Sequence, residues 1–227
     1  MIKNIEKVVL NLYLIITIFI NIFVFHFLHS TFSIKELTII LILGFMALVF
    51  ETLFNLYWAI LTKKRLFKYK YGCILNCNSS IYNVLLWYAG ILLLFTIYKI
   101  FNYTIFLKGY LIYTLSTTIL LILFLLTKNI KHKPKVFPLI PLILPLIVYI
   151  IIAHSFKFLI TLLVFSTIAF SVELTINIIG KIITKKYLWT YEYCPILNKA
   201  TSLYNIIPFM YASAGFITII EIAKLFF

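Results

Sequence analysis

Aspartate is absent from this chain of 227 residues, and its only acidic side chains are 6 glutamates. Charged residues make up 11% of the sequence, whereas hydrophobic residues make up 64%. A chain this apolar cannot hide its hydrophobic surface in a water-soluble core. We therefore expect an all-α integral membrane protein whose solvent is the lipid bilayer, with no separate soluble domain.

The sequence patterns of common catalytic sites are also missing. The chain has no Walker A sequence, no Gly-x-Ser-x-Gly and no His-Glu-x-x-His. Its 4 histidines, His26, His29, His132 and His154, are scattered and have no partner at metal-ligand spacing. We expect no enzymatic activity, no cofactor and no metal, and an intramembrane enzyme acting on lipid through paired carboxylates remains a minor alternative.

Cysteine is scarce, with 3 residues at Cys73, Cys77 and Cys194. Their spacing fits neither a disulfide framework nor a Cys-x-x-Cys metal site, so we expect reduced thiols. The abundance of Ile, Lys, Asn, Phe and Tyr is typical of an AT-rich genome. It indicates a low-GC bacterium and hence the plasma membrane of a bacterium.

Apolar runs long enough to cross a bilayer follow one another along the chain. A membrane helix needs about 20 apolar residues, and the first run is too long for the hydrophobic region of a signal peptide, so we expect it to be a mature helix. The sequence predicts about seven helices, at about 8–29, 37–61, 81–101, 107–127, 136–153, 158–183 and 203–223.

Basic residues alternate between the two sides of these helices. If the N-terminus is cytoplasmic, 15 of the 20 Lys and Arg residues lie on the cytoplasmic side. The positive-inside rule then places the C-terminus outside. We interpret the basic loops as topology signals that face anionic lipid, and they do not imply nucleic acid.

Two polar stretches repeat each other at a distance of 122 residues. They are YGCILNCNSSIYN at 71–83 and YCPILNKATSLYN at 193–205. The halves around them align without a gap, and the identities include Glu, Asn, Lys and Tyr as well as apolar residues. The sequence predicts one domain, 1–227, with parallel tandem three-helix repeats at about 8–101 and 130–223 and a linker helix at about 107–127.

Two glutamates, Glu51 and Glu173, fall near the middle of predicted helices and match each other in the two repeats. A carboxylate at that depth is costly and has to find donors, a wet cavity or a proton. Asn55 and Asn177 follow one helical turn later, within hydrogen-bonding reach. These pairs are either interhelical clamps or a substrate or coupling site between the repeats.

The polar stretches themselves have two interpretations. Each leads into a helix, so its polar residues either cap that helix or form a short re-entrant segment, and the tyrosines lie at the level of the lipid headgroups. The candidate residues of this motif are Asn76, Ser80, Tyr82, Asn83, Asn198, Ser202, Tyr204 and Asn205.

These residues give the chain a resemblance to the CmpB-like family of ABC-transporter type IV membrane proteins. The matching positions are Glu51, Gly72, Ile81, Tyr82, Glu173, Trp189, Tyr191 and Pro195. Ala47 and Leu48 replace a family Gly-Trp pair, and the family's Arg-Gly and Gly-Pro signatures are lost, so the resemblance is to a divergent member.

The resemblance implies a permease-like subunit that moves an unidentified small solute. Energy would come from a separate ATPase subunit or from an ion gradient. The alternative is a non-transporting scaffold or regulatory subunit, in which the Glu and Asn pairs act only as interhelical clamps.

Overall fold

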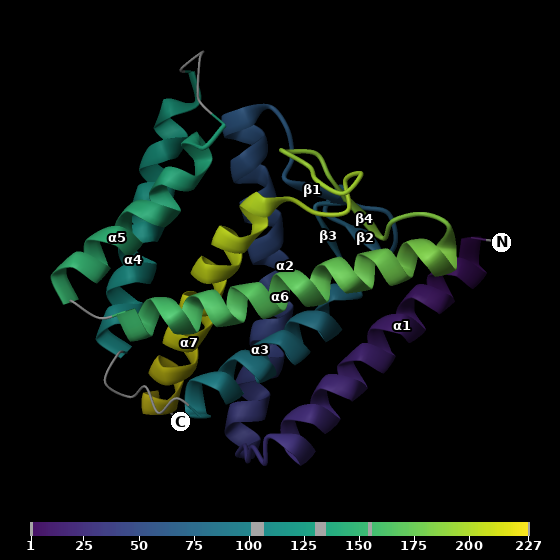
Figure 1. Ribbon diagram of the computed structural model, residues 1–227, viewed down its shortest axis with the longest axis horizontal. Coiled ribbons are helices and arrows are strands. Elements are labelled where there is room, and N and C mark those ends of the chain that lie inside the picture. Colours follow the sequence, from purple (N-terminus) through teal and green to yellow (C-terminus); the bar gives the residue numbers. More distant parts are fainter. Residues whose placement is uncertain (1, 101–106, 130–134, 154–155, 227) are drawn as a thin grey trace.

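A computed structural model describes residues 2–100, 107–129, 135–153 and 156–226 of the chain (Figure 1). This part of the chain contains seven α-helices, as the sequence predicts. They are α1 (Ile2–Ile22), α2 (Ile34–Thr62), α3 (Asn83–Ile100), α4 (Leu107–Leu125), α5 (Ile140–Ala153), α6 (Phe156–Thr184) and α7 (Ile206–Phe226).

Six helical segments are long and apolar enough to cross a membrane. The fifth expected span is shorter than predicted, because α5 has 14 residues and begins at Ile140, after a 3₁₀ turn at Phe137–Leu139. Proline lacks a backbone N–H, and Pro138 and Pro141 stand where the helix would otherwise have begun. The described part of the chain is therefore mostly helical, as in a membrane protein, with six helices long enough to cross a bilayer and a shorter seventh helix.

Four short strands accompany the predicted helices in the described part of the chain. They are β1 (Phe67–Tyr69), β2 (Cys73–Ile74), β3 (Ser79–Ser80) and β4 (Trp189–Tyr191). β1 pairs antiparallel with β4, so that Phe67 lies opposite Tyr191, and β2 pairs with β3. The loop after α2 and the loop after α6 are thereby joined at one end of the helices (Figure 1).

The helices before these two loops match each other closely. α2 and α6 both have 29 residues, and their first residues are 122 positions apart. Both are followed by a lysine in the left-handed region, Lys63 at φ 61° and Lys185 at φ 60°. The same offset that relates the two polar stretches therefore relates the two helices.

Close helix packing holds α3 against α2 and α7 against α6, and α4 lies against α5 and α7. Gly44 allows the first contact, since a Cβ at this position would lie 3.3 Å from Tyr88 N and Val84 O. A glycine at a helix crossing lets two backbones approach, as is common in membrane helices. The α2–α3 pair carries Glu51 and Asn83 into the interior.

Replacing Gly44 with Leu is expected to lower the free energy of unfolding by about 1–3 kcal/mol, because the new side chain would meet backbone atoms that cannot rotate away. Gly90→Leu in α3 is the matched control, because a Cβ there meets nothing within 4 Å. Thermal unfolding in detergent should show a drop for Gly44→Leu only. Equal drops for both variants would contradict the assigned contact.

Candidate functional site

Glu51 is buried in α2 and accepts hydrogen bonds from three side chains. Its partners are the Tyr69 hydroxyl at 2.9 Å, the Asn83 amide at 2.9 Å and the Ser79 hydroxyl. Tyr69 and Ser79 belong to the loop and Asn83 is the first residue of α3, so the loop folds inward to reach the helix. The buried carboxyl is thereby supplied with donors, as a polar group removed from water requires.

Glu173 in α6 has an equivalent setting. The Tyr191 hydroxyl and the Asn205 amide donate to it, and the same amide also donates to the Tyr191 hydroxyl at 2.6 Å. Tyr191 and Asn205 lie 122 positions after Tyr69 and Asn83. Each half therefore builds a cluster of Glu, Tyr and Asn from one long helix, one strand and the start of the next helix.

Asn55 and Asn177 do not bond to the glutamates, which corrects the predicted Glu–Asn pairs. The Asn55 oxygen accepts from Leu66 N at 2.8 Å, and its amide donates to Phe67 O at 2.8 Å. The Asn177 oxygen accepts from Leu188 N at 2.9 Å, and its amide donates to Trp189 O at 3.0 Å. Each asparagine side chain thus satisfies backbone N–H and C=O groups of its loop. The role of both residues is to hold the two loops against the helices.

Asn55→Ala is expected to lower the free energy of unfolding by about 2–4 kcal/mol, because it leaves buried loop amides without acceptors. Asn177→Ala should cost a similar amount, and Asn21→Ala at a part-buried position in α1 serves as the control. Thermal unfolding in detergent measures all three. A decrease in the free energy of unfolding no larger than that of Asn21→Ala would contradict the clamp role.

Tyr69 and Tyr191 are site residues that the sequence interpretation missed. Burial, and next the neighbouring glutamate, raise the pKa of each phenol well above its ordinary value. Both therefore remain neutral hydrogen-bond donors at physiological pH. Their signal was present in the sequence, because both are identical tyrosines at the offset of 122, but only the structure brings them to the glutamates.

The rest of the predicted polar motif has separate roles. Ser80 donates to Tyr71 O at 2.9 Å and Ser202 donates to Cys194 O at 3.1 Å, so both stabilise the loops internally. Tyr82 and Tyr204 pack edge-on against Tyr13 and Tyr193.

Two further residues of the motif, Asn76 and Asn198, are exposed and do not reach the carboxyls. Each is the middle residue of three consecutive residues with positive φ, 75–77 and 197–199. Of the predicted motif, only Asn83 and Asn205 contact the carboxyls. The stretch at 71–83 contains the paired strands β2 and β3, and the stretch at 193–205 contains an isolated bridge between Ile196 and Thr201.

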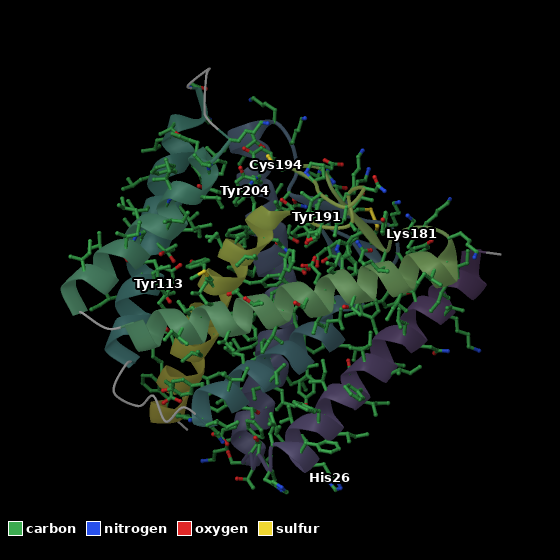
Figure 2. All side chains as sticks on the ribbon, viewed as in Figure 1. His26, Tyr113, Lys181, Tyr191, Cys194 and Tyr204 are labelled. Carbon is green, nitrogen blue, oxygen red and sulfur yellow. A yellow bond between two sulfur atoms is a disulfide. The ribbon has the colours of Figure 1, made fainter. Side chains whose placement is uncertain are left out.

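The predictions for the cysteines and the histidines have different outcomes. Cys73 and Cys77 form a disulfide, which corrects the expectation of reduced thiols, and Cys194 is free. His26 lies at the bottom of the view in Figure 2, well away from Tyr191. His132 and His154 lie outside the described residues, and the described residues contain no group of three or more potential metal ligands.

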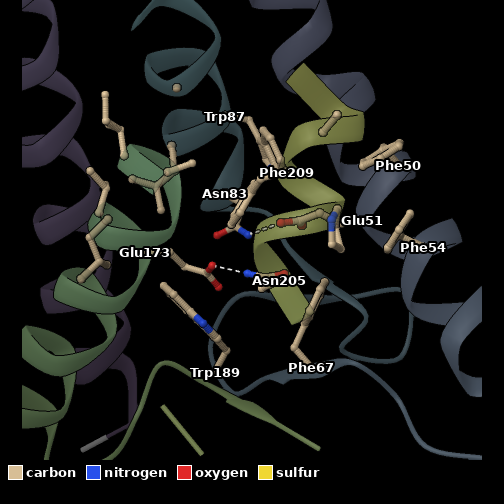
Figure 3. A pocket seen from close by; sticks show the side chains of 18 of the residues that line it. Phe50, Glu51, Phe54, Phe67, Asn83, Trp87, Glu173, Trp189, Asn205 and Phe209 are labelled. Atoms are coloured by element: carbon tan, nitrogen blue, oxygen red, sulfur yellow. Dashed lines mark hydrogen bonds between the residues drawn. The ribbon is translucent and has the colours of Figure 1, made fainter. Parts of the chain in front are cut away.

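A cavity of about 120 Å³ lies between α2, α3, α6 and α7, and both carboxyls line it. Figure 3 shows Glu51 and Glu173 directed into it from different helices, with Asn83 between them. Most of the wall is apolar, and the aromatic residues in it are Phe50, Phe54, Phe67, Trp87, Phe165, Trp189, Tyr69, Tyr191 and Phe209. The site thus combines a polar pair of clusters with an aromatic enclosure.

The two clusters are not equivalent. Ser79 donates to Glu51, but Thr201, at the corresponding position of the second half, has a buried hydroxyl without a hydrogen-bond partner. Glu51 is 7% exposed, whereas Glu173 is only half-buried. Glu173 is therefore the carboxyl with fewer protein donors and more accessible surface.

Comparison with known proteins finds no relative of the chain. No protein-family model, no curated protein and no solved structure matches the chain.

Proposed function

We propose that the chain is a permease-like membrane subunit that moves a small solute through the cavity between α2, α3, α6 and α7. The observation that carries the proposal is the pair of carboxyl groups, Glu51 and Glu173, that line one cavity from two membrane-length helices. Ionisable groups within membrane segments usually mark a substrate or ion pathway.

An internal duplication is part of this proposal. The two Glu-Tyr-Asn clusters, the two asparagine clamps and the two long helices all recur at the offset of 122. Parallel repeats of about 8–101 and 130–223, joined by the linker helix, would place the solute site at their common interface. Many transporters bind their substrates at such an interface.

The bacterial plasma membrane, a cytoplasmic N-terminus and an external C-terminus belong to the proposal on the basis of the basic loops. Lys63, Lys64, Lys185 and Lys186 are exposed residues of the two loops that β1 and β4 join. The pairing brings these cations to the same end of the helices, as the positive-inside rule requires for cytoplasmic loops.

A separate ATPase subunit would supply energy if the resemblance to the CmpB-like family extends to mechanism. The protein should be tagged at its endogenous level and purified from native membranes in mild detergent, and the partners identified by mass spectrometry. We expect a stoichiometric ATPase. Recovery of the chain alone would contradict that partner and leave an ion gradient as the energy source.

The double variant Glu51→Gln/Glu173→Gln is expected to abolish solute movement, because it removes both cavity carboxyls. Membrane vesicles carrying the wild type, the double variant or Glu192→Gln would be given a mixture of labelled metabolites, and uptake would be followed by mass spectrometry. Glu192 is exposed on the loop after α6 and provides the matched control. Both the wild type and the control should move a solute that the double variant does not.

The second candidate function is a scaffold or regulatory subunit. The observation that favours it is that the side chains of Asn55 and Asn177 bind the loop backbone through both their oxygen and their nitrogen. It predicts that the double glutamine variant loses thermal stability and that no solute crosses any of the vesicles. Normal solute movement by a folded double variant would instead remove the carboxyl mechanism.

A further inference from the structure

The two cavity carboxyls have no cationic partner within the described part of the chain. Lys99 and Lys224 pair with Glu36 and Glu221 at 2.9–3.4 Å, but no described Lys or Arg forms an ion pair with Glu51 or Glu173. Buried charges are normally paired, because desolvation without a partner costs several kcal/mol. The cavity therefore lacks a positive group at the position where the protein places its two carboxyls.

Asn83 provides a second and independent indication of a missing donor. Its amide nitrogen donates to Glu51 and to the Tyr69 hydroxyl, and these two bonds fix the orientation of the amide. The side-chain oxygen then points the other way. It is fully buried, since Asn83 is only 4% exposed, and it has no hydrogen-bond partner. Figure 3 shows this oxygen on the side of Asn83 that faces Glu173.

The unused acceptor capacity is concentrated around Glu173. Glu51 already accepts from three side chains, whereas Glu173 accepts from two and is the more accessible carboxyl. A carboxylate offers about four lone-pair sites. Glu173 and the Asn83 oxygen thus form a group of acceptors that calls for a ligand with several N–H donors and a positive charge.

The walls determine the rest of the ligand. Trp87, Trp189, Phe67 and Phe209 line the cavity close to the carboxyls, and aromatic rings attract organic cations as well as apolar groups (Figure 3). A metal cation would instead need about six oxygen ligands. A cavity of about 120 Å³ compares with one of about 150 Å³ that holds benzene, which limits the ligand to about six heavy atoms.

We infer that this cavity binds a small organic cation, a primary ammonium with an apolar body, with Glu173 as its counter-ion and the Asn83 oxygen as a second acceptor. The binding site deepens the proposed function, and only the claim that this cation is the transported solute rests on it. The exposed lysines of the loops do not oppose binding, because solvent screens their charges while the carboxyls act at short range in a low-dielectric cavity.

Binding is tested with three probes of about six heavy atoms and different charge: cyclopentylammonium, cyclopentanol and cyclopropanecarboxylate. Purified full-length protein in detergent is titrated at pH 7 and constant ionic strength, and the signals are calorimetric heat and the fluorescence of Trp87 and Trp189 in the cavity wall. We expect the cation to bind at least tenfold more tightly than the alcohol, and the carboxylate not to bind. A matched titration with sodium chloride should give no signal.

Variants locate the site. Glu173→Gln should weaken binding of the cation at least tenfold and leave binding of the alcohol unchanged, whereas Glu192→Gln should bind as the wild type does. Gly90→Leu is a second test that keeps every polar contact, because the position lines the cavity and has open space beside it. Its side chain should fill the cavity and abolish binding of both the cation and the alcohol.

Three outcomes would overturn the inference. They are equal affinity for all probes, a response to sodium ions alone, and undiminished cation binding by both Glu173→Gln and Gly90→Leu. If the protein moves a solute in vesicles but prefers the alcohol or the carboxylate, the inference fails and the proposed function survives. If it binds the cation in detergent but moves nothing, the proposed function fails and the site survives.

Discussion

The structure depends on the burial of two carboxyl groups inside apolar helices. Neither helix can supply enough donors from its own side chains, so each carboxyl requires another segment to come to it. The loop after each long helix meets this requirement, since Tyr69 and Tyr191 donate to Glu51 and Glu173 from strands that pair with each other. The position of the loops, the start of α3 and α7, and the cavity between the halves all follow from this constraint.

The asparagine clamps make the arrangement possible at the level of the backbone. Short strands near membrane helices carry N–H and C=O groups that need partners away from water. Asn55 and Asn177 serve these groups at the start of β1 and β4. The asparagines and the glutamates therefore have different physical roles, although Asn55 and Asn177 lie one turn after the glutamates on the same helices.

Much of the helical architecture could be predicted from the sequence, because apolar runs of about 20 residues have few alternatives to a membrane helix. The seven helices lie where the hydropathy places them, apart from α5, which prolines shorten. The repeat in sequence also picked out Glu51, Glu173, Asn83 and Asn205, and all four line the cavity.

The contacts of the loops could not be predicted in the same way. One-turn spacing suggested that Asn55 would bond to Glu51, but an asparagine that can reach unpaired backbone groups bonds to them instead. Strands of two or three residues carry no periodic pattern, so the sequence analysis did not predict β1 to β4. The inequality of Ser79 and Thr201 depends on side-chain positions and is visible only in three dimensions.

The most direct test of the account is an experimental structure of the protein, purified from native membranes in mild detergent and enlarged with a bound antibody fragment for electron microscopy. The account predicts non-protein density in the cavity, in hydrogen-bonding contact with Glu173 and the Asn83 oxygen. A cavity closed by side-chain packing, with Glu51 and Glu173 bonded only to other protein groups, would contradict it.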